Sequence, residues 1–195
     1  SGVIVAARTK PAAAFLSGAF SSRDVKKTYL AIVCGGPPDP TEGDIDKPLR
    51  KVSRHLDRRR PRRRETPDVA ASNTAGGDAG GPSAIDIMEI SASGQAAFTR
   101  YRTLSAAGAA ALLQLDPETG RMHQLRAHLA SIGHPIAGDG KYGGLFSIGA
   151  VAIPGLMLHA AALDIPHPDG GRRQFEAPPP PAFRETLQSL ALELA

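Results

Sequence analysis

The chain has 195 residues, 42% of them hydrophobic, so it is long enough for one domain with a packed core and too apolar for a disordered protein. The formal net charge of +4 suits a polyanionic partner, although many ordinary enzymes carry a similar charge. The single cysteine, Cys34, excludes a disulfide within the chain, and we expect it to be buried in the apolar run 30–34. No stretch has the length of a membrane span and no secretory signal is visible, so we expect a soluble intracellular protein of the cytoplasm, the nucleus or an organelle.

The first part of the chain predicts two strands and a helix. Residues 3–7 are short, apolar and β-branched at alternate positions, which predicts a buried strand. Lys10-Pro11 places a proline at the first position of a helix, where its missing N–H is tolerated. Residues 26–34 alternate between two apolar faces and end at Gly35-Gly36-Pro37, so we expect a second strand there.

Residues 50–84 differ in composition from the rest of the chain. Seven arginines fall between positions 54 and 64, and a tract of Gly, Ala, Ser and Asp runs from 70 to 83. Because such a segment cannot bury a core, we interpret it as a basic, low-complexity, disordered insertion in a single domain spanning 1–195. Clustered arginines bind phosphate well, so the insertion predicts a contact with RNA; the plainer alternative is a solvated insertion with no set task.

The remainder of the chain predicts more strands than helices. Alternating or apolar runs predict strands near 85–90, 97–104, 109–115, 156–165 and 174–176. We expect a helix near 119–132, and a closing helix from Ala182 with a buried apolar stripe formed by Phe183, Leu187, Leu190 and Leu194. Short turns join most of these strands, which favours an α+β fold with a mixed, mainly antiparallel central sheet and flanking helices.

The segment from Thr119 to Arg126 carries the most chemical information. We expect Thr119 to cap the helix, and Arg121 to lie one turn before Leu125 on the same helix face, so that both face one cleft. A buried arginine needs an anionic partner, for which a carboxylate or a phosphate is the natural choice. Arg126 is expected to point elsewhere, toward phosphate or water.

Nearby histidines and glycines allow other interpretations. His123, His128 and His134 are spaced by five and six residues, which does not place them on one helix face, so we expect no metal site and a hydrogen-bonded structural role for His128. The glycine-rich segment 133–144 lacks the Gly-Lys-Ser/Thr of a phosphate-binding loop. It either offers backbone N–H groups to a phosphate or shapes the rim of the site.

Several motifs, taken together and in this order, resemble the RluA-like family of RNA pseudouridine synthases. They are Ser1-Gly2-Val3-Ile4-Val5-Ala6, Lys27-Thr28-Tyr29-Leu30-Ala31, Thr119-Gly120-Arg121-Met122-His123-Gln124-Leu125-Arg126, Gly133-His134-Pro135-Ile136 with Gly138-Asp139 and Tyr142-Gly143, Leu158-His159-Ala160, and His167-Pro168. The resemblance covers nearly the whole chain except residues 50–84. It implies the pseudouridine synthase fold and the isomerisation of uridine to pseudouridine in ribosomal or transfer RNA, with no cofactor or metal.

The resemblance also implies roles for individual residues. Tyr29 would pack on the target base and assist proton removal, while Arg121 would pair with the catalytic aspartate and hold it ionised. Leu125 would help to wall an apolar pocket. The target base must leave the helical stack to reach such a pocket, where an aromatic face can receive it. The other candidates for substrate binding are Lys27, His123 and Arg126.

One residue of the family pattern lies outside the sequence. The family's aspartate sits in a His-Arg-Leu-Asp stretch shortly before a Thr-Ser-Gly, and Ser1-Gly2 resemble the end of that run. We therefore expect the aspartate upstream of Ser1, and expect these 195 residues alone to be inactive. Arg54-His55-Leu56-Asp57 looks like a copy of the motif, but it lies in the insertion, so Asp57 is not expected to be the nucleophile. Asp24 and Asp139 are poor candidates as well.

Three functions fit these motifs. The first is an RNA pseudouridine synthase, the second a non-catalytic RNA-binding relative within a ribosomal or RNA-processing assembly, and the third a structural domain that binds protein through residues 50–84. Tyr29 and Arg121 favour the enzyme, because a relative without catalysis has little reason to keep a buried arginine unpaired. The sequence directly before Ser1 would separate the first function from the second.

Overall fold

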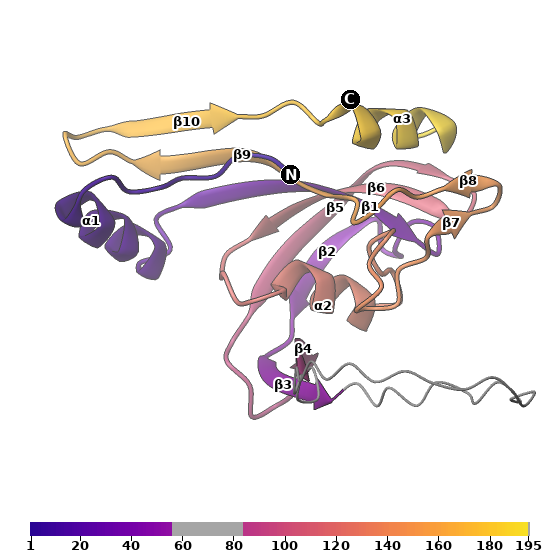
Figure 1. Cartoon of the computed structure of the whole chain (residues 1–195), viewed down its shortest axis with the longest axis horizontal. Coiled ribbons are helices and arrows are strands. Elements are labelled where there is room, and N and C mark those ends of the chain that lie inside the picture. The colour runs from indigo at the N-terminus through magenta and orange to yellow at the C-terminus, as the bar shows by residue number, and fades with distance from the viewer. Residues whose placement is uncertain (56–83, 195) are drawn as a thin grey trace, which may run out of the picture.

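A six-stranded antiparallel sheet organises the computed structural model, which describes residues 1–55 and 84–194 (Figure 1). The strand order is β10-β9-β1-β6-β5-β2, and every pair of neighbouring strands is antiparallel. The strands are β1 (Lys26–Cys34), β2 (Glu42–Asp46), β5 (Phe98–Ala107), β6 (Ala110–Pro117), β9 (Leu158–Pro166) and β10 (Arg172–Glu176). The α+β fold with an antiparallel central sheet is therefore confirmed, and β1 has the predicted bounds. The polar edge strand β2 was not predicted.

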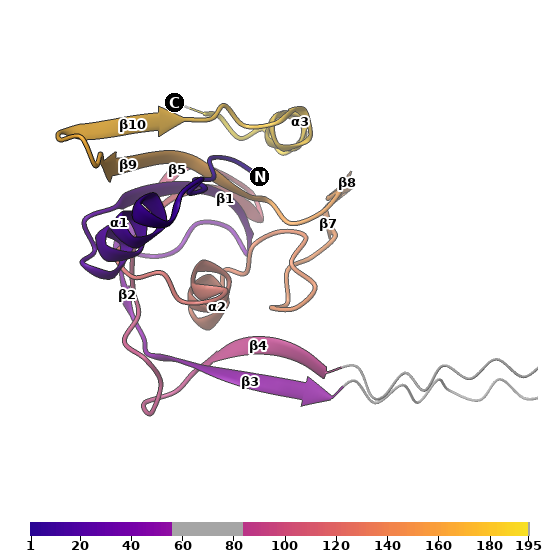
Figure 2. The same ribbon diagram turned by 60° about the vertical axis from the view of Figure 1, so that its left-hand side comes forward.

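In the described part of the chain, three helices flank the sheet. Helix α2 (Gln124–Ser131) and helix α3 (Pro181–Ser189) lie on opposite faces, as Figures 1 and 2 both show, while α1 (Lys10–Ser21) lies near the far end of β9 and β10. Helix α1 begins where the proline predicted it, and the Oγ1 atom of Thr9 caps it by accepting a hydrogen bond from the Ala12 N–H at 3.3 Å. None of the helices in the described ranges is long and apolar enough to cross a membrane.

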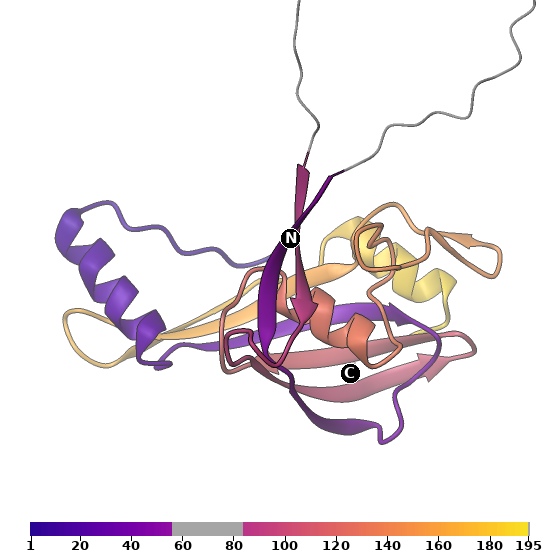
Figure 3. The same cartoon turned by 90° about the horizontal axis from the view of Figure 1, so that it is seen from below.

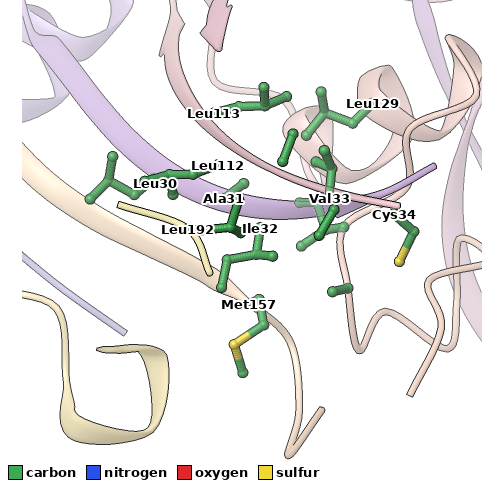
Figure 4. Close-up of a cluster of buried hydrophobic side chains, with 14 of the residues drawn as sticks. Leu30, Ala31, Ile32, Val33, Cys34, Leu112, Leu113, Leu129, Met157 and Leu192 are labelled. Atoms are coloured by element: carbon green, nitrogen blue, oxygen red, sulfur yellow. The ribbon is translucent and has the colours of Figure 1, made fainter. Parts of the chain in front are cut away.

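The main core forms on both sides of β1 and β6. Apolar residues 30–34 of β1 are all buried, Cys34 included, as its place in the run predicted. Figure 4 shows Leu113 and Leu129 on one side of this strand, and Met157 and Leu192 on the other. Helix α2 supplies Leu129 to the first side, and the segment after α3 supplies Leu192 to the second. Burial on both faces explains why β1 is apolar at every position from Leu30 to Cys34.

A separate hairpin lies beyond α2. Strands β3 (Leu49–His55) and β4 (Ala84–Ile90) form a two-stranded sheet, and Leu49 also makes an isolated bridge with Gln95. In Figure 2 the hairpin lies away from the main sheet, on the side of α2, and in the view from below it crosses in front of the sheet (Figure 3). The base of the hairpin packs on the domain through a small cluster formed by Leu49, Met88, Ala97 and Ala127, with Tyr142 against it. A second, two-residue hairpin joins β7 (Ser147–Ile148) to β8 (Val151–Ala152).

The hairpin corrects the expected bounds of the insertion. Residues 50–55 belong to β3 and Ala84 to β4, paired in register from Leu49 with Ile90 to His55 with Ala84. The alternation in this arginine-rich stretch was hidden by its charge. Asp57 and the arginines from 58 to 64 lie outside the described residues.

Residues 3–7 do not form the expected strand. Gly2 makes a parallel bridge with Ala160, and the Val3 N–H donates to the Ala160 carbonyl at 2.9 Å, but the pairing ends there. From Ala162 onward β9 lies between β1 and β10, so both of its edges are occupied. This apolar, β-branched run therefore stays outside the sheet because neither edge of β9 is open to it beyond Ala162.

Helices α2 and α3 differ in part from the helices that the sequence predicted. The helix expected near 119–132 is shorter, starting only at Gln124. The apolar stripe of the closing helix holds at Leu187 but not at Leu194, which is 47% exposed. Helix α3 ends at Ser189 and the backbone of Ala191 is left-handed (φ 53°), so Leu192 is buried in its place.

Candidate active site

A cavity of about 270 Å³ opens between β1, the turn before α2, and the first residue of β9. The sequence placed six residues in one site, and all six line this cavity: Lys27, Tyr29, Arg121, His123, Leu125 and Arg126. Strand β1 supplies the first two, whereas the turn 117–123 and the first residues of α2 supply the rest. Segments about ninety residues apart in the chain are thus brought together by the pairing of β1 with β6.

The turn that carries Arg121 is held by the side chain of Gln124. The Gln124 Oε1 atom accepts hydrogen bonds from the Arg121 N–H at 3.0 Å and from the Thr119 hydroxyl at 2.6 Å. Its Nε2 atom donates to the Phe98 carbonyl at 2.9 Å and to Thr99 Oγ1 at 3.0 Å. Thr119 is therefore not the helix cap that the sequence predicted, because its hydroxyl also accepts from the Phe98 N–H at 3.0 Å. This buried, fully bonded amide fixes the turn to β5.

Arg121 lies in that turn rather than on the helix. It and Leu125 still line the same cavity, as predicted. The Arg121 Nε donates to the Ala96 carbonyl at 3.1 Å, and among the described residues no carboxylate forms an ion pair with it. Its guanidinium thus has donors left for an anion, since it offers five N–H groups in all.

Burial changes the acid–base behaviour of both β1 residues. It raises the pKa of the Tyr29 hydroxyl, so at neutral pH this group is a hydrogen-bond donor rather than a phenolate. Burial lowers the pKa of the Lys27 ammonium, which donates to the Thr119 carbonyl at 3.4 Å.

Arg126 does not point to phosphate or water alone, as the sequence suggested. Its Nε and Nη2 atoms both donate to the carboxylate of Asp139 at 2.7 Å, and the Asp139 side chain is fully buried. The guanidinium also lies over the ring of Tyr142, 5.0 Å from its centre. The glycine-rich segment is thereby fastened to α2, and Asp139 is already engaged by a cation.

His123, His128 and His134 do not cluster, and each has different hydrogen-bond partners. Both ring nitrogens of the buried His128 are bonded at 3.0 Å, to Thr99 Oγ1 and the Lys47 carbonyl, which confirms its structural role. His134 lies 3.1 Å from the Gly36 carbonyl. His123 alone lines the cavity, with Nδ1 3.1 Å from the Tyr142 hydroxyl.

The first residue of the chain lies at the margin of the same cavity. The backbone nitrogen of Ser1 lies 3.3 Å from the carbonyl of Leu158, which lines the cavity. The Ser1 hydroxyl lies 2.9 Å from Nδ1 of His159, whose Nε2 lies 2.9 Å from the Ala177 carbonyl. A carbonyl can only accept, so the Nε2–H of His159 donates to Ala177. His159 thus joins Ser1 to the linker before α3.

Two further hollows adjoin the cavity, and both carry cations. Arg121 is shared with a hollow of about 480 Å³ against the hairpin, where Arg50 and Lys51 also contribute. Lys27 is shared with one of about 460 Å³ on the other side, which Arg23 and Lys26 line. The three hollows share lining residues, which suits an elongated ligand better than a small one, although Asp116 and Glu118 also line the hollow beside Lys27.

The sequence missed the residues that hold the site in place. Gln124, Tyr142 and His159 all fall within the quoted motifs, but nothing in their spacing showed which backbone groups they bond. Asp139 was rejected as a nucleophile, and its role as the partner of Arg126 was not foreseen. A carboxylate in a glycine-rich turn, thirteen residues after an arginine, is too weak a pattern to predict an ion pair.

Known proteins are similar to this chain in both sequence and fold. A family model described as RNA pseudouridylate synthase matches residues 1–131. The chain is 32% identical over 212 residues to a mitochondrial pseudouridylate synthase, RPUSD4, of Xenopus tropicalis, covering 98% of this chain and 62% of that protein. It is 37% identical over 181 residues to the dual-specificity RNA pseudouridine synthase RluA of Escherichia coli, covering 91% and 68%.

A solved structure agrees. Human RNA pseudouridylate synthase domain containing 4 superposes with a TM-score of 0.66 at 27% identity, covering 95% of this chain and 70% of that one. The chain thus spans less than two thirds of the Xenopus protein's length. With the family model matching two thirds of its residues, the chain belongs to the RNA pseudouridine synthase family, among the RluA-like members.

Proposed function

We propose that the protein containing this chain isomerises uridine to pseudouridine in RNA, and that the cavity between β1 and α2 receives the target base. The observation that carries the proposal is the meeting of Tyr29 and Arg121 in one cavity. An aromatic ring beside an arginine with free donors suits a flat base next to an anion. The family and its named members, all described as pseudouridine synthases, support the reaction type.

The aspartate belongs, in this proposal, to the segment that precedes Ser1. Ser1 is bonded to the carbonyl of Leu158, which lines the cavity, so residues joined to Ser1 start at its margin. A carboxylate arriving there would meet the unpaired donors of Arg121, and a cation beside it would keep it ionised in a half-buried place. Asp24 does not compete for this role, since it is bound to Arg172 at 2.6 Å on the outer surface.

The isomerisation consumes no second reactant, so the site acts mainly by positioning the base and the sugar. The bond between C1′ and N1 breaks, the uracil turns, and a bond between C1′ and C5 forms; C5 loses a proton and N1 gains one, so the atoms balance. The aspartate acts at the sugar, Tyr29 packs on the base, and Leu125 walls the pocket. Tyr29 enters the reaction protonated, because burial raises its pKa. Its hydroxyl can then donate a hydrogen bond or relay a proton, but it is not a base at the start of the reaction.

Ribosomal and transfer RNA are the proposed substrates. The flanking hollows would meet the phosphates next to the target nucleotide. Arg23 and Lys26 line one of them. Arg50 and Lys51 line the other, where they would exchange their ion pairs with Glu89 and Asp86, at 2.6 and 2.7 Å, for phosphate. Arginines between positions 58 and 64 add further positive charge to the chain. Lys27 stands between the cavity and one hollow, and is proposed to contact the nucleotide there.

The test uses the full-length protein and transcripts of ribosomal and transfer RNA labelled with tritium at C5 of uridine. Pseudouridine formation releases this tritium to water, so turnover is counted directly. We expect release with the wild type, and a loss of about a hundredfold to a thousandfold in Arg121→Ala, the range known for removal of a key electrostatic group. Arg184→Ala, on the exposed face of α3, is the control and should keep full activity.

The alternative function, RNA binding without catalysis, predicts a different result. The full-length protein would then bind the transcripts but release no tritium from any of them. Normal turnover by Arg121→Ala would remove the role proposed for that residue. An assembly with ribosomal or RNA-processing partners would appear as co-sedimentation of the full-length protein with ribosomal particles.

A further inference from the structure

The hydroxyl of Tyr142 joins three segments that are far apart in the chain. It lies 2.7 Å from the Met88 N–H of β4 and 3.1 Å from Nδ1 of His123, which lines the cavity. Tyr142 itself belongs to the glycine-rich segment, and is half-buried. One oxygen atom therefore connects the β3–β4 hairpin to the wall of the candidate active site.

The directions of these hydrogen bonds follow from the atoms involved. The Met88 N–H can only donate, so the Tyr142 oxygen accepts from it, and its own proton is left for Nδ1 of His123. Burial, with help from the charges of Arg126 and Lys141, lowers the pKa of His123, against a smaller opposite effect of Asp139. The ring is therefore neutral near pH 7, Nδ1 accepts, and the ring proton sits on Nε2.

The backbone of His123 is held in an uncommon conformation. Its φ of 50° is left-handed, which costs a residue with a side chain about 1–2 kcal/mol. The imidazole meets the ring of Tyr142 edge to face, with centres 5.7 Å apart and planes at 88°. Strained residues of this kind persist where the surroundings fix them, and they gather at functional sites.

Tyr142 is itself held rigidly. The guanidinium of Arg126 lies over its ring at 5.0 Å, and Arg126 is held by two hydrogen bonds to buried Asp139. The same carboxylate accepts from the Lys141 N–H at 3.1 Å, next to Tyr142 in the chain. The chain of contacts from Asp139 to His123 thus leaves the tyrosine hydroxyl little freedom.

Within the described residues, Nε2 of His123 has no hydrogen-bond partner. We propose that Tyr142 is a positioning residue: it orients the Nε2–H of His123 as an uncharged donor to an oxygen of the RNA nucleotide in the cavity, and makes that donor depend on the β3–β4 hairpin. This inference rests on the proposed function, and it adds His123 as a residue that contacts the nucleotide and the hairpin as an element coupled to it.

The test is a double-mutant cycle in the full-length protein, read as kcat/KM for pseudouridine formation. Tyr142→Phe keeps the ring and its contact with Arg126 but removes the hydroxyl; we expect kcat/KM to fall about tenfold or more, the scale of one missing hydrogen bond at a site. His123→Asn tolerates the left-handed backbone and lacks Nε2. If Tyr142 acts through His123, adding Tyr142→Phe to His123→Asn should change kcat/KM by less than about twofold. Multiplying losses would overturn the proposal.

Tyr101→Phe is the matched control. Its hydroxyl is also bonded to backbone, donating to the Pro40 carbonyl at 3.1 Å, but it lies away from the cavity in β5. We expect it to keep kcat/KM within about twofold even where its thermal stability falls as much as that of Tyr142→Phe. Equal losses of kcat/KM in both tyrosine variants would mean that Tyr142 is merely structural.

Two further readouts separate this proposal from the function on which it rests. Because the donor is uncharged, Tyr142→Phe should weaken RNA binding without changing the slope of log Kd against log salt, whereas Lys51→Ala should flatten it. Nitrogen-15 NMR of histidine-labelled protein needs no turnover: it should show His123 with its proton on Nε2, and a mixture of tautomers in Tyr142→Phe. A wild type without turnover would refute the proposed function, while a His123 protonated on Nδ1 would refute this inference.

Discussion

Replacing Gln124 with methionine removes the amide that fixes the turn 119–123, while keeping nearly the same length and volume of side chain. The amide makes four hydrogen bonds, between 2.6 and 3.0 Å, and the residue is 4% exposed. Water therefore cannot easily replace the amide. The substitution tests whether a buried polar network, rather than helix propensity, shapes the segment that carries Arg121.

The expected loss of stability follows from these bonds. Each buried hydrogen bond contributes about 0.5–1.5 kcal/mol net, so four give roughly 2–6 kcal/mol. Three of the partners keep another bond: the Phe98 carbonyl also accepts from the Glu118 N–H, Thr99 Oγ1 still meets His128, and Thr119 Oγ1 still accepts from the Phe98 N–H. The Arg121 N–H keeps none among the described residues. We therefore expect the lower part of the range, about 2–4 kcal/mol, out of a total typical for domains of about 5–15 kcal/mol.

Urea unfolding followed by circular dichroism measures this difference. Gln188→Met, the same exchange on the exposed side of α3, is the control and should change the free energy of unfolding by less than about 0.5 kcal/mol. A loss in Gln124→Met no larger than in the control would refute the reasoning that the amide holds the turn. In the full-length enzyme, kcat should fall more than KM rises, because a loose turn misplaces Arg121.

Three other changes have definite outcomes. Burial lowers the pKa of His128, so as the pH falls the unfolded state is protonated before the folded state. The contribution of His128 to the free energy of unfolding is therefore full above about pH 6.5 and is lost as the pH falls to the folded pKa, by about 1.4 kcal/mol for each unit of pKa difference. His128→Gln should flatten this pH dependence in urea titrations at pH 5–8. A Cβ on Gly144 would lie 1.9 Å from the Ile136 carbonyl, so Gly144→Ala should lower Tm, whereas Gly18→Ala, with open space around it in α1, should raise Tm slightly; equal shifts would contradict this. Replacing the six arginines from 58 to 64 with glutamine should reduce the slope of log Kd against log salt by about 0.7 for each phosphate of single-stranded RNA that they neutralise, and an unchanged slope would mean that they do not touch the RNA.

The sequence predicted the parts of the fold that depend on local pattern. Strand β1 has its expected bounds because an apolar run, buried on both faces, ends at Gly35-Gly36-Pro37. Helix α1 begins at Lys10 because proline suits a first turn. Residues 3–7 show the limit of this approach: their pattern is that of a strand, but whether an edge of β9 is open depends on β10, more than 160 residues later.

The sequence predicted which residues line the site but not which hydrogen bonds hold them in place. The resemblance to a family brought Tyr29 and Arg121 to one place, and the cavity contains both. Thr119 looked like a helix cap because its type and position suit one, yet the competing bond to Gln124 moved the helix start by five residues. Such competition between side chain and backbone depends on strand β5, which no local pattern near residue 119 reveals.

We propose that this cavity, completed by an aspartate from the segment before Ser1, makes pseudouridine in the full-length protein. The direct measurement is mass spectrometry of ribosomal and transfer RNA transcripts after incubation with the full-length protein, comparing the wild type with a variant in which that upstream aspartate is replaced by asparagine. We predict pseudouridine at defined uridines with the wild type and none with the variant, while both bind the RNA equally. Pseudouridine formed equally well by the variant, or by the 195 residues alone, would contradict the account.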